Sequence, residues 1–296
     1  MNARIAIPSW VSAAGVTLVA CLFAASAGAQ VRRIEKHFRV EDKPVVTVQN
    51  PSGRIQVKAW DKHEVMVVGQ HTGNNLDMDT EQVGNRIEIA SLPKAGVNTS
   101  AMELKTDYEI SVPAESELQV RTDSGNVTVE SVRGNMTFDT VAADLSLQNV
   151  VGYLVIKTIG GSLLCTHCEG RLEATSISGN VHLIQPVMDN VRVQTSSGNI
   201  LFDGVFVNRG IYVLKNYSGS IEVRFSSSDS FDLHAASLYG NVFNQAPVVP
   251  NKHRASNNPP YVPGIAKGLV GSVNQGNAKV ELSSFNGTIK ILKRDH

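Results

Sequence analysis

The chain has 296 residues, enough for one large domain or two small ones, and 42% of them are hydrophobic. Its 27 basic residues are balanced by 27 acidic ones without a basic block, so its charge gives no reason to expect nucleic-acid binding. Beyond Ala29 helical periodicity is scarce, and Val, Ile, Thr, Ser, Asn and Gly dominate, which favours strands and turns.

Residues 1–29 read as an export signal. Arg4 gives a positive start, residues 5–25 are mostly apolar or small, and Ala27-Gly28-Ala29 forms a cleavage site before Gln30. A second interpretation is a lipoprotein signal, because Leu18-Val-Ala-Cys21 resembles a lipobox that would leave a lipidated Cys21 as the N-terminus. The residues after Cys21 stay apolar, which favours cleavage after Ala29. No later run is long enough to span a bilayer, so we expect membrane attachment only if Cys21 is lipidated.

Residues 30–112 are expected to form an N-terminal β region. A five-residue phrase, with a small residue followed by two apolar residues at alternate positions, occurs at 44–48 and again at 53–57. Residues 32–39 are polar and charged, and 71–106 break the phrase around a strand expected at 86–90. A repeat protein needs a terminal unit that covers its core and its unpaired edge. We therefore interpret this region as the start of a repeat stack together with its cap.

From residue 113 to 296 the phrase organises the chain. It recurs every nine residues, from Gly125-Asn-Val127-Thr-Val129 to Gly179-Asn-Val181-His-Leu183. Apolar residues two apart lie on one face of a strand, and the glycine suits a tight corner. The pattern predicts an all-β fold, a single-stranded parallel β-solenoid whose core contains Val127, Leu145 and Leu163.

A second regularity sets the size of one coil. A Ser, Thr or Asn stands three residues before alternate glycines, and Ser-Gly-Asn corners at Ser124, Ser178 and Ser197 return at multiples of roughly twice the rung length. Two rungs of about nine residues per coil are therefore favoured over three, because a three-sided coil would bring unlike corners into register. Repeated Asn and Ser at corners can bond local backbone groups.

The end of the chain brings one interruption. Residues 246–268 are rich in Pro and Asn, which predicts an exposed loop. Rungs return at 278–282 and 287–291, nine residues apart. The charged residues Lys293 to His296 would then blunt a final edge strand.

These motifs resemble the DUF4097 family of bacterial adhesin-like domains. The resemblance rests on residues 38–68 with Asn50-Pro-Ser-Gly53 and Trp60-Asp61, on residues 108–113, on the Ser-Gly-Asn corners and on residues 286–289. It covers nearly all of the chain after the signal. It implies exported β-solenoids associated with surface adhesion, and it brings no catalytic residues to transfer.

Cys165-Thr-His167-Cys168 is the sharpest local feature. In an oxidising compartment so close a pair favours a local disulfide. A metal site would need two more ligands, and no second Cys pair or His pair stands at ligand spacing. Two free thiols and a redox role remain as alternatives, although a redox motif would want a helix N-terminus to lower the thiol pKa.

Two tyrosines are candidates for a binding face. Tyr153 and Tyr212 are expected on outward strand positions, where they could contact a sugar or a protein. The outward acids Asp123, Asp144 and Glu173 show no convergence of the kind a glycan-cleaving pair requires. The histidines are scattered, which favours solvated surface positions.

The sequence thus predicts an exported protein of the periplasm or cell surface, without enzymatic activity or cofactor, that binds a surface protein or glycan. One alternative is a structural scaffold of the periplasm that assembles through its edges. A carbohydrate-active β-helix enzyme is the third hypothesis. A search for polysaccharide cleavage separates the first hypothesis from the third.

Overall fold

The protein is built from strands. The computed structural model describes residues 31–72, 75–94, 104–250 and 267–294. Within them it contains β1 Val31–Arg39, β2 Val45–Trp60, β3 Glu64–Thr72, β4 Leu76–Val83, β5 Arg86–Pro93, β6 Thr106–Pro113, β7 Glu117–Glu130, β8 Met136–Gln148, β9 Val151–Thr158, β10 Leu163–Thr166, β11 Glu169–Ser176, β12 Val181–Ile184, β13 Val187–Thr195, β14 Ile200–Asp203, β15 Ile211–Asn216, β16 Ser220–Phe225, β17 Phe231–Ser237, β18 Val242–Asn244, β19 Lys267–Val273, β20 Ala278–Ser284 and β21 Thr288–Lys293. The prediction of an all-β fold is confirmed for this part of the chain.

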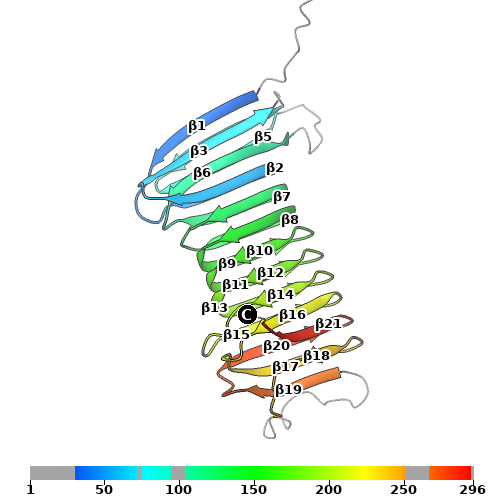
Figure 1. Ribbon diagram of the computed structural model, residues 1–296. Coiled ribbons are helices and arrows are strands. Elements are labelled where there is room, and N and C mark those ends of the chain that lie inside the picture. Colours follow the sequence, from blue (N-terminus) through cyan, green and yellow to red (C-terminus); the bar gives the residue numbers. More distant parts are fainter. Residues whose placement is uncertain (1–30, 73–74, 95–103, 251–266, 295–296) are drawn as a thin grey trace, which may run out of the picture.

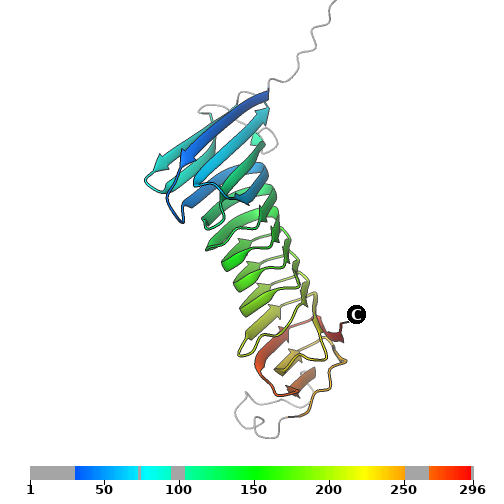
Figure 2. The ribbon, with the colours of Figure 1, turned by 60° about the vertical axis from the view of Figure 1, so that its left-hand side comes forward.

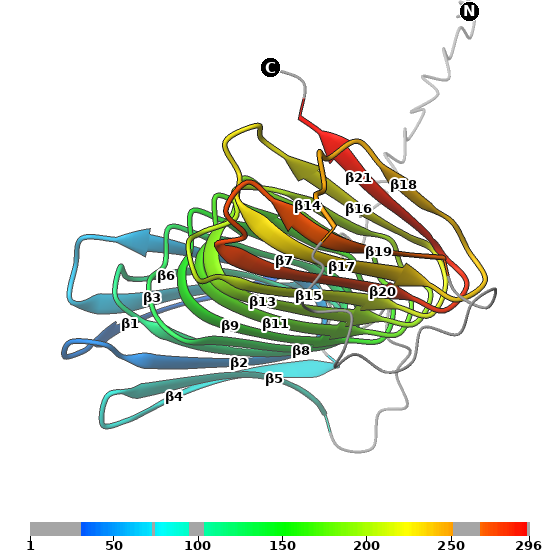
Figure 3. The ribbon, with the colours of Figure 1, turned by 90° about the horizontal axis from the view of Figure 1, so that it is seen from below.

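The strands stack into two walls that face each other (Figures 1 and 3). The first wall runs in the order β4, β5, β2, β7, β8, β9, β11, β13, β15, β20, β17, β19. The second runs β1, β3, β6, β2, β7, β8, β10, β12, β14, β16, β21, β18. The long strands β2, β7 and β8 pass through both. Most pairs are parallel, which confirms a solenoid-like architecture.

The core lies between the walls, and its columns follow the repeat. In the second wall Leu163 pairs with Leu145 on one side and with Val181 on the other, and all three are at most 2% exposed. Val127 pairs with Leu145 in the same column. Alternation of inward and outward side chains along each strand gives this result. The inward position of Val127, Leu145 and Leu163 is confirmed.

One set of corners is held by a buried hydroxyl and a glycine. The Gly161 N–H donates to Thr158 Oγ1 at 3.1 Å, and the Gly179 N–H donates to Ser176 Oγ at 2.7 Å. A β-carbon on Gly161 would lie 1.8 Å from the carbonyl oxygen of Ala143 in the next coil. The hydroxyl therefore bonds a backbone donor that the turn leaves unpaired, and the glycine lets neighbouring coils approach.

The residue after the corner glycine links one coil to the next. The Ser220 N–H donates to Asn199 Oδ1 at 2.8 Å, and the Asn199 N–H donates to Asn180 Oδ1 at 2.9 Å. Asp144 accepts the Ser162 N–H at 2.9 Å in the same way. The Ser-Gly-Asn corner thus has a physical reason, because a short side-chain acceptor at this position bonds the backbone of the following coil.

The last coil of the chain is not the last coil of the stack. β20 lies between β15 and β17, and β21 lies between β16 and β18 (Figures 1 and 2). The prediction of a blunted final edge strand is therefore wrong. Arg294 instead donates from Nε to Asp203 Oδ1 at 2.7 Å and from Nη2 to the Gly204 carbonyl at 2.9 Å, fixing the strand end against the turn after β14.

Both ends of the stack contain strands that the repeat phrase does not describe. β1 with β3, β3 with β6, β4 with β5, and β17 with β19 pair antiparallel. At one end, β1, β3 and β6 extend the second wall beyond β2, and β4 and β5 extend the first (Figure 1). The polar, charged segment at 32–39 lies within β1. Its charged side chains point outward, so its backbone can still pair with β3.

The predicted exposed loop at 246–268 needs correction at both ends. Ala246 is buried in the core, Val249 bridges to Ser272, and residues 267 and 268 begin β19. The Pro- and Asn-rich composition predicts turns over the whole stretch. It does not show that single apolar residues such as Ala246 pack in the core. Residues 251–266 and the predicted signal at 1–29, including Cys21, lie outside the described residues.

Candidate binding surface

Tyr153 lies on the outer face of the first wall, where the sequence placed it. Its ring is 42% exposed, and its Oη donates to Glu173 Oε2 on β11 at 2.9 Å. This hydrogen bond raises the pKa of Tyr153 above its ordinary value, because the carboxylate favours the protonated phenol. An open hollow of about 470 Å³ surrounds the pair and is also lined by Asn135, Arg171, Leu172, Asn190 and Arg192.

A β-bulge shapes this hollow. Gly170 pairs with Met188 and Arg171 with Asn190, so Asp189 is the extra residue on β13. The bulge brings the Asp189 carboxylate within 3.4 Å of the Arg171 guanidinium. Arg171 is thereby held beside Tyr153, its strand neighbour. The hollow presents a phenol, two guanidinium groups, two amides and a carboxylate, groups that hydrogen-bond hydroxyls and acidic groups of a ligand.

Tyr212 does not belong to this surface, and its expected outward position is wrong. It is 1% exposed, and its Oη donates to the Met188 carbonyl at 2.7 Å and accepts the Val207 N–H at 2.9 Å. The sequence phrase took Ile211 and Val213 as the inward pair, whereas Tyr212 pairs with Val191 and Leu214 with Val193 in the core. A shift of one residue turns every side chain of a strand to the other face.

Tyr212 instead joins an aromatic cluster inside the stack. Its ring centroid lies 5.3 Å from that of Phe202 and 4.8 Å from that of Phe206, and Phe206 packs on Phe231 at 4.7 Å. The turn between β14 and β15 is longer than the turns of the preceding coils, and it brings Phe206 into the core. Extra core volume in this coil therefore accommodates the tyrosine ring.

Cys165 and Cys168 are both fully buried, and their sulfur atoms are joined as a disulfide. Cys165 occupies the inward column between Leu147 and Leu183, and Cys168 lies in the following corner. Neither sulfur is positioned to meet a ligand at the surface. In the described parts of the chain, no group of three or more His, Cys, Asp or Glu could hold a metal ion.

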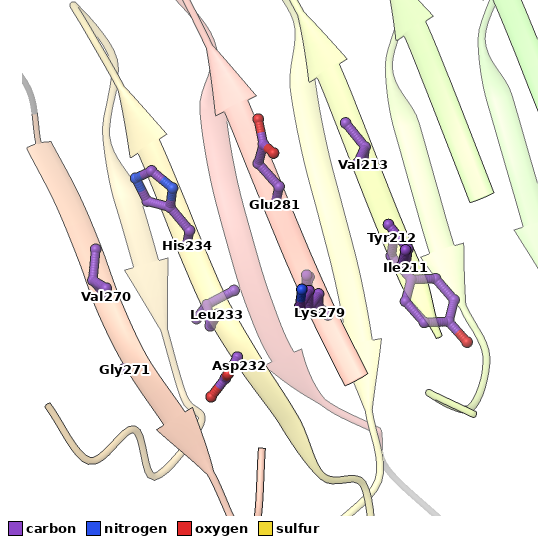
Figure 4. Close-up of a pocket in the computed structure, with 11 residues that line it drawn as sticks. Ile211, Tyr212, Val213, Asp232, Leu233, His234, Val270, Gly271, Lys279 and Glu281 are labelled. Atoms are coloured by element: carbon purple, nitrogen blue, oxygen red, sulfur yellow. The ribbon is translucent and has the colours of Figure 1, made fainter. Parts of the chain in front are cut away.

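A second hollow, of about 290 Å³, opens on the first wall near the far end of the stack (Figure 4). Ile211 on β15, Lys279 and Glu281 on β20, Asp232 and His234 on β17, and Val270 on β19 line it. Its acids already have partners: Glu281 pairs with Lys215 at 2.7 Å, and Asp232 accepts from Ser272 Oγ at 2.6 Å. We interpret these charges as a solvated, mutually paired sheet surface.

An aromatic group at the corners was missed as a group by the sequence reasoning. Tyr217 stacks on Phe285 with ring centroids 4.4 Å apart and an interplanar angle of 9°, and Tyr239 meets Phe285 edge-on at 5.1 Å. Both tyrosines are exposed, Tyr217 at 58% and Tyr239 at 67%. The signal was present, because Tyr217 and Phe285 each follow a buried Asn or Ser of the corner column.

The acids considered for glycan cleavage do not meet. Glu173 lies on the outer face of the first wall, and Asp144 lies on the second wall, where it accepts the Ser162 N–H.

Among the described residues, no helix has the length and hydropathy needed to traverse a bilayer.

Comparison with known proteins gives the family. The sequence profile of the Toastrack DUF4097 family matches residues 45–292, most of the chain. The chain belongs to this family. The resemblance seen in its corner and core motifs is thereby confirmed. A search of the curated proteins found no match.

Three solved structures resemble the chain at low identity. A "putative cell adhesion protein" from Clostridium sporogenes ATCC 15579 is 12% identical over 89% of this chain and 100% of its own, with a TM-score of 0.28. A "putative adhesin" from Bacteroides fragilis NCTC 9343 is 11% identical over 88% and 97%, with a TM-score of 0.46. A "putative adhesin" from Parabacteroides distasonis ATCC 8503 is 11% identical over 88% of this chain and 97% of its own, with a TM-score of 0.37.

Proposed function

We propose that this Toastrack protein is an exported, non-enzymatic β-solenoid with two rungs per coil that acts as an adhesin-like interaction module of the periplasm or cell surface. Residues 1–29 direct its export, and residues 30–112 cap one end of the stack. Its partner is a surface protein or glycan, contacted through the outer face of the first wall.

The observation that carries this proposal is the register of outward side chains on that face. Tyr153 pairs with Arg171 and Arg171 with Asn190, so successive coils present one contact row about 4.8 Å apart. The next row contains Glu173 and Arg192. A rigid array of this kind pays little ordering entropy on binding and favours several weak contacts at once.

The test is the binding of fluorescently labelled mature protein to intact cells and to isolated envelope fractions. We expect Tyr153→Ala/Arg192→Ala to weaken binding about tenfold or more, since each tenfold step requires only about 1.4 kcal/mol of lost contact. Gln148→Ala/Lys290→Ala, on the second wall, is the matched control and should bind normally.

Equal losses in both variants, or an absence of binding by the parent protein, would contradict the proposal. Cleavage of a polysaccharide by the purified mature protein in a substrate screen would overturn its non-enzymatic part. All four side chains lie on outer faces, so both variants should fold normally. Circular dichroism checks that they do.

A further inference from the structure

One corner of the stack presents a continuous apolar ridge. We define the corner ridge as the residue that follows each buried Ser, Thr or Asn of the column, from Val141 through Ile159, Ile177, Ser196 and Tyr217 to Phe285. Except for Ser196 its members are large and apolar, between 38% and 58% exposed. Tyr239, 67% exposed, extends it through its contact with Phe285. These corners lie along the right-hand edge of the stack in Figure 1.

The spacing of the corner ridge is fixed by backbone hydrogen bonds. The Val141 carbonyl accepts from Gly160 N–H at 2.7 Å, that of Ile177 from Ser197 at 2.9 Å, and that of Ser196 from Ser218 at 2.8 Å. The residues that donate form a neighbouring column, whose side chains are small at Gly160, Ser178, Ser197 and Ser218 and which continues with Asn286. A protein surface can therefore approach the ridge closely on this side.

The ring geometry limits what the ridge binds. Tyr217 and Phe285 stack face to face, so their faces are turned toward each other along the stack and their edges point outward. A sugar ring stacks on an aromatic face, and the stack covers one face of each of these two rings. Ring edges and aliphatic side chains suit an apolar protein surface, since aromatic edges pack on aliphatic groups and on other rings.

The order of residues along the ridge makes it complementary to itself. Ser196 stands at its centre, with the aliphatic side chains of Ile177, Ile159 and Val141 on one side and the aromatic rings on the other. A second copy turned about a two-fold axis at Ser196 would set Ile177 against the partner's Tyr217 and Ile159 against the partner's Phe285. An interface of this type uses the same patch twice and closes at two copies.

The charges beside the ridge permit this arrangement. The adjoining row of the first wall contains Asp139, Lys157, Thr175, Gln194, Lys215 and Ser283 in order along the stack. In an antiparallel pair Gln194 meets its own copy, Thr175 meets Lys215, and Lys157 meets Ser283. No two like charges are opposed within this row, so the row adds no like-charge repulsion to the contact of the ridges.

We propose that the corner ridge is a homotypic interface, through which two copies of this protein associate antiparallel about Ser196. Five steps of about 4.8 Å make the ridge about 24 Å long. At about 12 Å wide it buries roughly 600 Å² over both copies, below the 1,200 Å² or so of a stable interface. The dimer is therefore weak, with a Kd of about 0.1–1 mM, and becomes significant where the protein is concentrated on a surface.

The experiment combines sedimentation equilibrium of the full mature chain with cysteine cross-linking. Ser196→Cys should give a covalent dimer on mild oxidation, because the axis brings the two copies of residue 196 within disulfide reach. Ser228→Cys, exposed in the turn between β16 and β17, is the control and should stay monomeric. Equal cross-linking of both variants would overturn the proposal.

A charge pair provides a second, independent readout. Ile177→Lys and Tyr217→Glu should each weaken self-association at least about tenfold, because each places a charge in an apolar contact. An equimolar mixture of the two variants should dimerise again, since the introduced charges are of opposite sign and then face each other. Undiminished dimers in the single variants would refute the interface. So would a parent protein that is still monomeric at 1 mM, which is about the upper end of the expected Kd. Flotation of the monomer with anionic phospholipid vesicles would assign the ridge to a lipid surface instead.

Discussion

The hydroxyl of Tyr212 ties three segments of the chain together. It bonds the Met188 carbonyl and the Val207 N–H while its ring packs edge-on against the stacked rings of Phe202 and Phe206. Burial raises the pKa of Tyr212 to about 12, and burial also raises the pKa of Tyr108 to about 12 beside Ser91. The folded state therefore favours the protonated form of both phenols.

Stability should consequently fall in alkali. Because the folded pKa lies above the unfolded value of 10, the contribution is fully present below pH 10 and is lost as pH rises through about 12. We expect the free energy of unfolding, measured in urea from pH 8 to 12, to drop over this interval. Tyr212→Phe should start about 1–3 kcal/mol lower and show a smaller drop. Tyr153→Phe, on the exposed face, should behave as the parent protein. Equal drops in the parent and Tyr212→Phe would contradict this assignment.

At the scale of the element, two adjacent glycines differ in whether the fold requires them: Gly161 has no room for a side chain, whereas Gly160 does. A β-carbon on Gly161 would lie 1.8 Å from the Ala143 carbonyl oxygen, whereas one on Gly160 would meet nothing closer than 3.6 Å. The clash at Gly161 involves backbone on both sides, so neither coil can move away without breaking the wall.

Alanine scanning of this corner should show the contrast. We expect Gly161→Ala to cost about 3 kcal/mol or more, since overpacking against backbone has no side chain to relax. Gly160→Ala should be neutral or stabilise slightly through the unfolded chain. The measurement is urea denaturation of the two variants side by side. Similar stabilities would mean that the coils do not approach as described.

The disulfide gives a prediction at the same scale. Its loop is only a few residues long, so the loss of unfolded-chain entropy contributes about 2 kcal/mol. Because both sulfurs are buried, the mature native protein should show no thiol that alkylates, by mass spectrometry, until it is unfolded with reductant. Two alkylated cysteines in native, unreduced protein would remove the disulfide.

Repetition made much of the element structure predictable. Corners with a hydroxyl and a glycine recur two rungs apart, as at Thr158 and Ser176. In each of these coils the inward residues are the ones two and four positions before the hydroxyl residue. The same count back from Asn216 gives Leu214 and Tyr212, the true inward pair. The phrase matched Ile211 and Val213 instead, because apolar residues also occupy outward positions there. Of the candidate binding residues, only Tyr153 was therefore placed correctly.

The order of coils in the whole molecule could not be predicted in this way. Periodicity tells which face a residue takes, and says nothing about which coil its strand pairs with. The coil of β20 and β21 inserts between coils that precede it in the chain, and only this insertion stacks Phe285 on Tyr217. The corner ridge and the C-terminal hollow both depend on it.

Three cysteine pairs on the outer face of the first wall test this coil order most directly. Ser283 pairs with Lys215 on one side and with Ala236 on the other. Oxidation should therefore form a disulfide in Lys215→Cys/Ser283→Cys and in Ser283→Cys/Ala236→Cys, whose positions are about one strand spacing apart. Lys215→Cys/Ala236→Cys, about two spacings apart, should stay reduced. Efficient cross-linking of this last pair, with failure of the first two, would show that the coils stack in chain order and would contradict the structure described here.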